Sequence, residues 1–218
     1  MTSLDYLIPA AFPALVLAHF VALLSPGPDF FLIAGNAIRY NLRGSRFICL
    51  GVALGNAVYI AVAILGWSGI RDNPQIFSVI ETIGAGYLLW IGVQLLRSRP
   101  QALALDSNEN QNQNQMPGIL KQLFLGINSA LLNPKNALFY MSLMAVILGP
   151  DVTLLQQIVC GIWMVLAVFL WDLFVAGAVG HQRVRVVLNR KIHWVERGAG
   201  AVLVSFGVGL LVQSNSRG

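Results

Sequence analysis

Two short segments of the chain place prolines and a charged residue inside long apolar runs. They are Leu24-Ser25-Pro26-Gly27-Pro28-Asp29-Phe30-Phe31 and Leu132-Asn133-Pro134-Lys135-Asn136-Ala137-Leu138-Phe139, about 108 positions apart. A proline inside a helix costs about 3 kcal/mol, and a charge at mid-bilayer costs about 2.5–3.5 kcal/mol on insertion scales. Paired broken helices in the two halves of a chain are typical of a transporter's binding site. We therefore expect these two segments to bind a small polar solute.

The first segment is expected to end one helix and begin another. Pro26 and Pro28 lack backbone N–H donors, and Gly27 allows close approach of the backbone. The helix that restarts near Asp29 would present free N–H groups, which attract anions such as a substrate carboxylate.

The second segment has the same design with different residues. Asn133 is well suited to cap a helix, and Pro134 is favoured in a first helical turn. A zwitterion held between the two breaks would meet the Asn133–Asn136 helix start and Lys135 with its carboxylate, and Asp29 with its ammonium.

Other interpretations of the two charges stay open. Lys135 and Asp29 could form a structural salt bridge that pins the two halves of the chain together, with or without a binding role. Asp29 could also serve only to stabilise the start of its own helix.

Two polar residues outside the breaks are further candidates. Asp172 lies well inside an apolar run, and intramembrane acids often relay protons or bind cations, so we expect it to have a coupling role beside Asp29 or a substrate role. A hydrogen bond to a neighbouring helix is the alternative. Asn56 is expected to line the cavity or to bond another helix, and Gly51 and Gly55 beside it favour tight helix packing.

The remaining chemistry-bearing residues favour structural roles. His19 is expected to pack or to form a hydrogen bond, with proton relay as the less favoured alternative, and His181 and His193 are expected to be solvated. Cys49 and Cys160 lie in apolar runs and predict buried, reduced thiols. The sequence has no nucleotide-binding, metal-binding or nucleophile motif, so we expect no cofactor, no metal and no enzymatic activity.

Composition identifies the class of protein. Of 218 residues, 56% are hydrophobic and only 11% are charged, and the mean hydropathy is +0.69. Soluble domains carry about 25% charged residues, so the sequence predicts an integral membrane protein. The net charge of +5 comes from short basic clusters between apolar runs and does not indicate nucleic-acid binding. The N-terminus has no positive region of the signal-peptide kind, so we expect the first run to be a mature span.

Six apolar runs are long enough to span a bilayer. They are roughly 7–38, 47–69, 75–96, 119–148, 154–180 and 194–212, with breaks near 25–28 and 133–134. Basic residues gather between alternate runs, at 39–46, 97–121 and 181–197. By the positive-inside rule these loops are cytoplasmic and both termini lie outside, in the plasma (inner) membrane.

The two halves of the chain are expected to be repeats. Residues 1–99 and 118–218 flank a polar segment, 100–117, that predicts a disordered linker. Glu81–Gly86 and Gly92–Leu96 match Glu196–Gly200 and Gly207–Leu211. Because each half has three spans, the second half must enter from the opposite side. The predicted fold is an all-α integral membrane protein with six transmembrane helices in two inverted three-helix repeats, the first and fourth helices being broken.

These motifs also carry a family resemblance. Ser25-Pro26-Gly27-Pro28-Asp29-Phe30-Phe31 is similar to the first motif of the threonine exporter branch, and Leu132-Asn133-Pro134-Lys135 matches the second motif. Over essentially its whole length the chain resembles the LysE/RhtB superfamily of amino-acid exporters. The resemblance implies export of amino acids, with threonine and homoserine first, in exchange for protons.

We therefore expect a proton-coupled exporter of small neutral amino acids whose partners are the amino acid, protons and the lipid bilayer. A homodimer is plausible, since two-fold dimers are the commonest oligomers. An uncoupled channel or facilitator, and a membrane module that transports nothing, are the alternatives.

Overall fold

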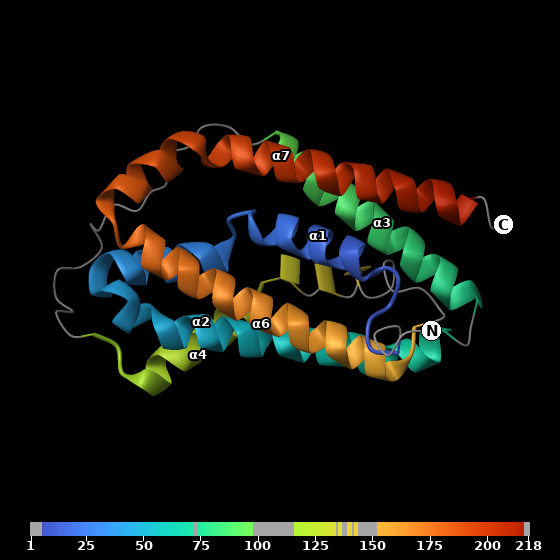
Figure 1. Cartoon of the computed structure of the whole chain (residues 1–218), viewed down its shortest axis with the longest axis horizontal. Coiled ribbons are helices and arrows are strands. Elements are labelled where there is room, and N and C mark those ends of the chain that lie inside the picture. The colour runs from blue at the N-terminus through green and yellow to red at the C-terminus, as the bar shows by residue number, and fades with distance from the viewer. Residues whose placement is uncertain are drawn as a thin grey trace.

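The computed structural model describes residues 6–71, 74–97, 116–133, 135–136, 139–140, 142–143 and 152–215. The regular elements in these ranges are helices: α1 (Phe12–Leu23), α2 (Pro28–Arg71), α3 (Pro74–Leu96), α4 (Ile119–Leu131), α6 (Leu154–Val179) and α7 (Gln182–Asn215). They run mainly along the long axis of the molecule (Figure 1). The predicted all-α class is confirmed. The predicted linker, 100–117, lies outside the described residues except for its last two positions.

Helix α2 joins two of the predicted spans. At Asn41 the backbone turns with φ 57° and ψ −164°, and the chain runs back along the molecule (Figure 1). The Ser45 hydroxyl donates to the Ile33 carbonyl at 3.3 Å, which brings the two arms together. The prediction of a loop at 39–46 is therefore wrong, because these residues are helical on both sides of the turn at Asn41. Asparagine tolerates a positive φ, so one residue makes the turn.

Helix α7 begins twelve residues before the expected start at 194. No glycine or proline interrupts residues 182–197, and arginine and lysine are good helix formers, so the helix continues beyond its apolar part. The expected loop at 181–197 is thus mostly helical. His181 is exposed, as predicted, whereas His193 is buried, which corrects the expectation that it is solvated.

Glycines allow α2 to lie directly against α4. A Cβ atom at Gly51 would meet the Leu123 carbonyl oxygen, and one at Gly126 would meet the Ile48 carbonyl oxygen. One at Gly55 would lie 2.6 Å from the Ala130 Cβ atom. The predicted tight packing at Gly51 and Gly55 is confirmed, and it joins the first half of the chain to the second.

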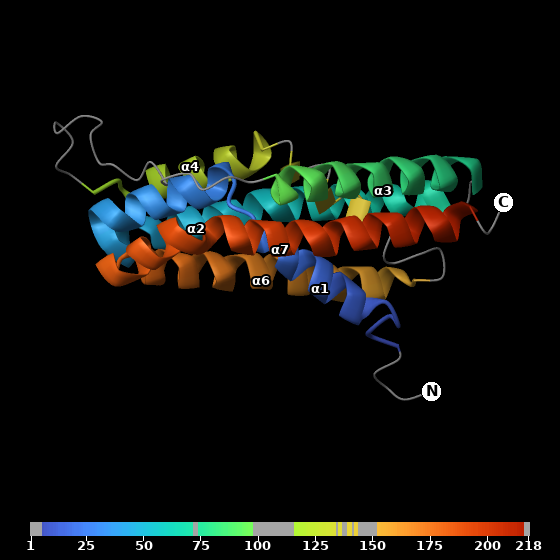
Figure 2. The same ribbon diagram turned by 90° about the horizontal axis from the view of Figure 1, so that it is seen from above.

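Helix α3 packs along α7, and the two run in opposite directions, as Figures 1 and 2 both show. Their contact is also made at glycines, since a Cβ atom at Gly200 would lie 2.6 Å from the Gly92 carbonyl oxygen. The closest helix pairs therefore join the halves, and the halves are not separate globular units.

Helix α6 is apolar on most of its surface. Its inner face buries residues that include Cys160, Met164 and Val168, and its outer face exposes large apolar side chains: Leu154, Leu155, Ile158, Ile162, Leu166, Leu170 and Phe174. A helix that exposes this much apolar surface is suited to lipid. Within the described residues, Pro28–Gly66 and Leu154–Val179 are long and apolar enough to cross a membrane, while Phe12–Leu23, Ala85–Leu96 and Ile119–Leu131 are shorter apolar helices.

Candidate functional site

The first predicted break lies between α1 and α2. Helix α1 ends at Leu23 and α2 begins at Pro28, whose fixed φ suits a first helical position. The Phe31 amide donates to the Gly27 carbonyl at 3.1 Å and so closes the first turn of α2. The Ser25 carbonyl lies in the break itself and accepts a hydrogen bond from the Lys135 side chain, which belongs to the second half of the chain.

The second predicted break follows α4. The Lys135 amide donates to Asn133 Oδ1 at 3.1 Å, and the Asn136 amide donates to the Asn133 carbonyl at 3.0 Å. These bonds are those of a helix N-cap, so the capping role predicted for Asn133 is confirmed. Pro134 lies outside the described residues.

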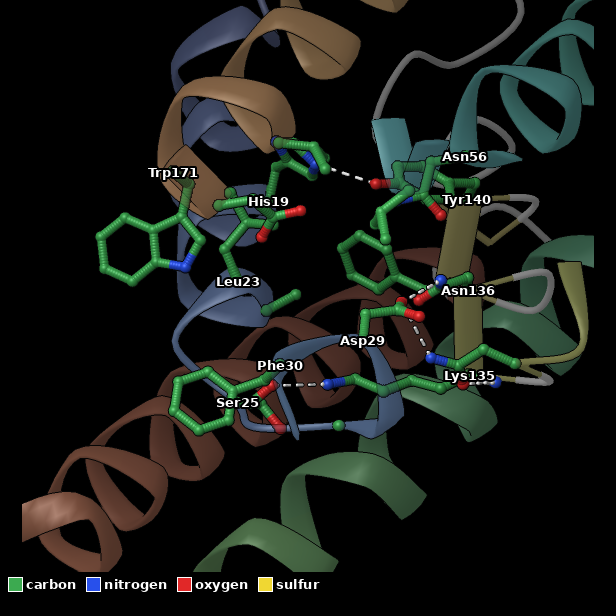
Figure 3. Close-up of a pocket in the computed structure, with 17 residues that line it drawn as sticks. His19, Leu23, Ser25, Asp29, Phe30, Asn56, Lys135, Asn136, Tyr140 and Trp171 are labelled. Carbon is green, nitrogen blue, oxygen red and sulfur yellow. Dashed lines mark hydrogen bonds between the residues drawn. The ribbon is translucent and has the colours of Figure 1, made fainter. Parts of the chain in front are cut away.

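Asp29 connects the two breaks. Its Oδ1 accepts a hydrogen bond from the Ser129 hydroxyl, and its Oδ2 accepts from the side-chain amides of Asn133 at 3.2 Å and Asn136 at 2.8 Å. Figure 3 shows Asp29 of the first half and Asn136 of the second half pointing toward each other. Hydrogen bonds to a charged group are worth about 1.5–3 kcal/mol each, so this carboxylate is a strong link.

Lys135 makes a second link between the halves. Its Nζ donates to the Ser25 carbonyl at 3.1 Å (Figure 3). Its own carbonyl accepts from the Tyr87 hydroxyl at 3.2 Å. The ammonium therefore caps the broken end of α1 instead of pairing directly with Asp29. We call the set Ser25, Asp29, Ser129, Asn133, Lys135 and Asn136 the break junction.

A polar cavity of about 70 Å³ lies beside the break junction. A single water molecule needs roughly 10–15 Å³ of cavity volume. This cavity therefore has room for several groups of that size. Among the residues predicted from sequence, those that line it are Gly27, Asp29, Asn56, Asn133, Lys135, Asn136 and Asp172. Pro26 and Pro28 are not among the lining residues and shape the break beside it.

Three buried polar atoms of the lining make no hydrogen bond within the described part of the chain. They are His19 Nδ1, Asn56 Oδ1 and Asp172 Oδ2. An unpaired buried donor or acceptor costs about 1–3 kcal/mol. Three of them around one cavity make this cavity the candidate functional site.

His19 and Tyr140 enter the site although neither was a predicted site residue. His19 is fully buried, and its Nε2 lies 3.3 Å from the Tyr140 hydroxyl (Figure 3). Its ring packs against Trp163. The predicted packing and hydrogen-bonding role is therefore confirmed, and cavity lining is added to it. Tyr140 lies four residues after Asn136, which is about one helical turn, and this spacing is the signal that could have pointed to it.

Ser129 is the other residue that sequence reasoning missed. It lies in the last turn of α4, four residues before Asn133, and its hydroxyl donates to Asp29. A hydroxyl in the last helical turn before the second break is a signal that could have found it.

A polar cavity at two helix breaks in an apolar helical bundle is typical of membrane transport proteins. The chain belongs to the LysE family: the model of the LysE type translocator matches residues 20–214. The resemblance carried by the two motifs is confirmed.

The chain is similar to threonine efflux proteins along most of its length. The protein of Salmonella typhi is 28% identical over 204 residues, which cover 92% of this chain and 97% of that protein. The Escherichia coli K12 protein is 26% identical over 202 residues, with the same coverage. A leucine efflux protein of Klebsiella pneumoniae is 31% identical over 140 residues, 64% of this chain and 59% of that protein. No solved structure matches the chain.

Proposed function

We propose that the protein is a secondary exporter of small neutral amino acids, with threonine or homoserine first, driven by proton antiport. One observation carries this proposal: in a member of a translocator family, Asp29, Lys135 and Asp172 line one cavity between two helix breaks. Charged groups at membrane depth are costly, and they are kept where they bind or move polar cargo.

The substrate carboxylate is proposed to bind at the second break. The Lys135 ammonium now donates to a neutral carbonyl, and a carboxylate would be the stronger acceptor because its hydrogen bonds are charge-assisted. Asn133 and Asn136, at the same helix start, supply further amide donors. Gly27 leaves room beside them, and Pro26 and Pro28 keep the first break open.

The break junction is proposed to act as the gate. The bonds from Ser129, Asn133 and Asn136 to Asp29, and from Lys135 to Ser25, all cross between the halves. Rocking one half against the other requires these bonds to break and re-form. A substrate that competes for Lys135 and the asparagine amides would weaken the gate when it binds.

The contacts of α3 and α7 support the proposed inverted repeat. A Cβ atom at Gly92 would meet Val204 and Gly200, and one at Gly207 would meet Leu89 and Ala85. The residues of the two halves correspond at a constant offset of 115 positions: 85, 89 and 92 correspond to 200, 204 and 207. The contacts of Gly92 are therefore the equivalents of the contacts of Gly207. An antiparallel helix pair with such contacts is expected around a two-fold axis in the membrane plane.

Coupling to protons is proposed to use Asp172, with Asp29 as the second candidate. Asp172 Oδ2 is buried at the cavity without a hydrogen-bond partner in the described chain, whereas Asp29 is fully engaged in the break junction. A proton would neutralise the Asp172 carboxylate during the part of the cycle in which no cation lies beside it.

The test is transport by the purified protein in liposomes with an imposed pH gradient. We expect uphill movement of labelled threonine that depends on the gradient. Lys135→Ala should lower the initial rate about tenfold or more, because a charge-assisted hydrogen bond is worth roughly 1.5–3 kcal/mol. Movement that runs only downhill would favour a facilitator. No movement of any amino acid in a wider panel would refute the exporter.

A further inference from the structure

We infer that Asp172, Asn56 and His19 form the subsite that binds the ammonium group of the substrate. The inference rests on the proposed export of amino acids and adds the way in which the site recognises a primary ammonium. It also moves that role away from Asp29, the acid that the sequence alone favours.

The three side chains come from different helices and meet at one cavity. His19 lies on α1, Asn56 on α2 and Asp172 on α6, and all three line the cavity beside the break junction. His19 is 0% and Asn56 4% exposed. His19 Nδ1, Asn56 Oδ1 and Asp172 Oδ2 are each buried without a hydrogen-bond partner among the described residues. Such atoms have already lost their hydration and gain most from a ligand that donates to them.

An ammonium group fits these atoms in number and in chemistry. It has three N–H donors and no acceptor, and it carries a positive charge. Asn56 Oδ1 and Asp172 Oδ2 are acceptors. His19 Nδ1 is an acceptor in the tautomer in which Nε2 donates to the Tyr140 hydroxyl, 3.3 Å away. Tyr140 acts as a positioning residue in this proposal, because a tyrosine hydroxyl that accepts from Nε2 holds His19 in the tautomer whose Nδ1 is an acceptor.

Asp29 is less suited to the ammonium because its oxygens are already occupied. Oδ1 accepts from Ser129, and Oδ2 accepts from Asn133 and Asn136. An ammonium would have to displace these donors, whereas Asp172 Oδ2 is unoccupied by any described group. The cavity then has Lys135 for the carboxylate and Asp172 for the ammonium, which matches the two charges of a zwitterion.

This subsite makes a specific demand on the substrate. It should favour a primary ammonium over an N-alkylated amine, which lacks one donor for each added methyl group. It should also reject the hydroxy acid in which a hydroxyl replaces the ammonium, because that molecule brings one donor and no positive charge to Asp172.

The first experiment changes the ligand and leaves the protein intact. Competition against labelled threonine is measured on the full-length protein in nanodiscs, with N-methylthreonine, N,N-dimethylthreonine and 2,3-dihydroxybutanoate. We expect affinity to fall about tenfold for the first lost donor and further for the second, as for charge-assisted hydrogen bonds. The hydroxy acid should bind at least about a hundredfold more weakly than threonine.

Variants then assign the effect to residues. Asn56→Leu and Asp172→Asn should each weaken threonine binding about tenfold and shrink the penalty for N-methylation to below about threefold. Asn56→Asp keeps an acceptor oxygen and should restore threonine binding. Asp29→Asn serves as the matched variant, because it neutralises the other acid of the cavity. It should leave the ratio of the affinities for threonine and the hydroxy acid unchanged.

The outcomes separate the subsite from the proposed function. Equal affinity for threonine, its N-methyl derivatives and the hydroxy acid would overturn the subsite while leaving export intact. The subsite would also be overturned if the ratio of the affinities for threonine and the hydroxy acid fell to about one in Asp29→Asn but not in Asp172→Asn. That result would assign the ammonium to Asp29. If the unaltered protein neither binds nor transports any amino acid, the proposed function fails, and the subsite fails with it.

Discussion

Asp29 accepts hydrogen bonds from three side chains of the second half, so replacing it tests the break junction directly. In Asp29→Asn, an NH₂ group would face donors of Asn133 or Asn136. We expect the free energy of unfolding to fall by about 1–3 kcal/mol, the cost of buried polar groups left unpaired. Threonine transport should fall at least tenfold. Thermal unfolding in detergent and liposome transport measure the two effects.

Asn36→Ala is the control for this prediction. Asn36 lies on the same helix, and among the described residues its side chain donates only to the Leu32 carbonyl of that helix, at 2.9 Å. This variant should keep wild-type transport. If Asp29→Asn matched Asn36→Ala in both stability and transport, the break junction would have no role in the cycle.

Individual site residues were predictable where the sequence itself carried an anomaly. Asp29, Lys135 and Asp172 are charges inside apolar runs, and each lies at the cavity. His19 is unusual in an apolar run, but a lone histidine favoured packing over a site role, and Tyr140 carries no anomaly because aromatic residues are ordinary in membrane helices. Their place at the cavity depends on how α1 packs against the segment after the second break, which sequence spacing does not define.

At the scale of helices, the contact between α2 and α4 depends on Gly126. A Cβ atom there would meet the Ile48 carbonyl oxygen and lie 2.8 Å from the Val52 nitrogen, both of them backbone atoms that have little room to yield. We expect Gly126→Ala to reduce stability by about 1–3 kcal/mol, as overpacking does. The midpoint of thermal unfolding in detergent would report this loss.

Gly86→Ala provides the opposite case. Gly86 is also inside a helix, but nothing lies within 4 Å of a Cβ atom placed there. Alanine should stabilise the protein by roughly 0.5–1 kcal/mol because it restricts the unfolded chain. Equal destabilisation by both substitutions would mean that close approach at Gly126 does not limit the packing of α2 on α4.

Helix boundaries were predictable where composition changes sharply. The start of α6 agrees with the predicted run, and Thr153 and Gln156 form a capping box there, with Gln156 Oε1 accepting from the Thr153 amide at 3.0 Å. The start of α7 was missed because apolarity ends where the bilayer ends, whereas a helix ends only at a breaker or cap. Asn41 was missed because one residue in a left-handed conformation leaves no pattern in hydropathy.

At the scale of the molecule, the basic ends of the helices gather at one end. The turn at Asn41, the start of α4 and the junction between α6 and α7 lie together at the left of Figure 1. Arg43, Lys121 and Arg183 belong to these segments. This arrangement agrees with the alternation of charge in the sequence and, by the positive-inside rule, makes this end the proposed cytoplasmic face.

Side-specific labelling of single cysteines tests this orientation. Arg43→Cys and Arg183→Cys introduce exposed thiols at the basic end, and Leu154→Cys introduces one at the start of α6, where the side chain is 62% exposed. A membrane-impermeant maleimide added to intact cells should label Leu154→Cys alone, and permeabilisation should add the other two. The unaltered protein is the control, because Cys49 and Cys160 are both 0% exposed and should stay unlabelled.

Labelling of the two arginine-site cysteines from opposite sides would contradict an even number of crossings between residues 43 and 183. Labelling of both from outside would reverse the orientation, so the proposed exporter would present its basic end to the exterior.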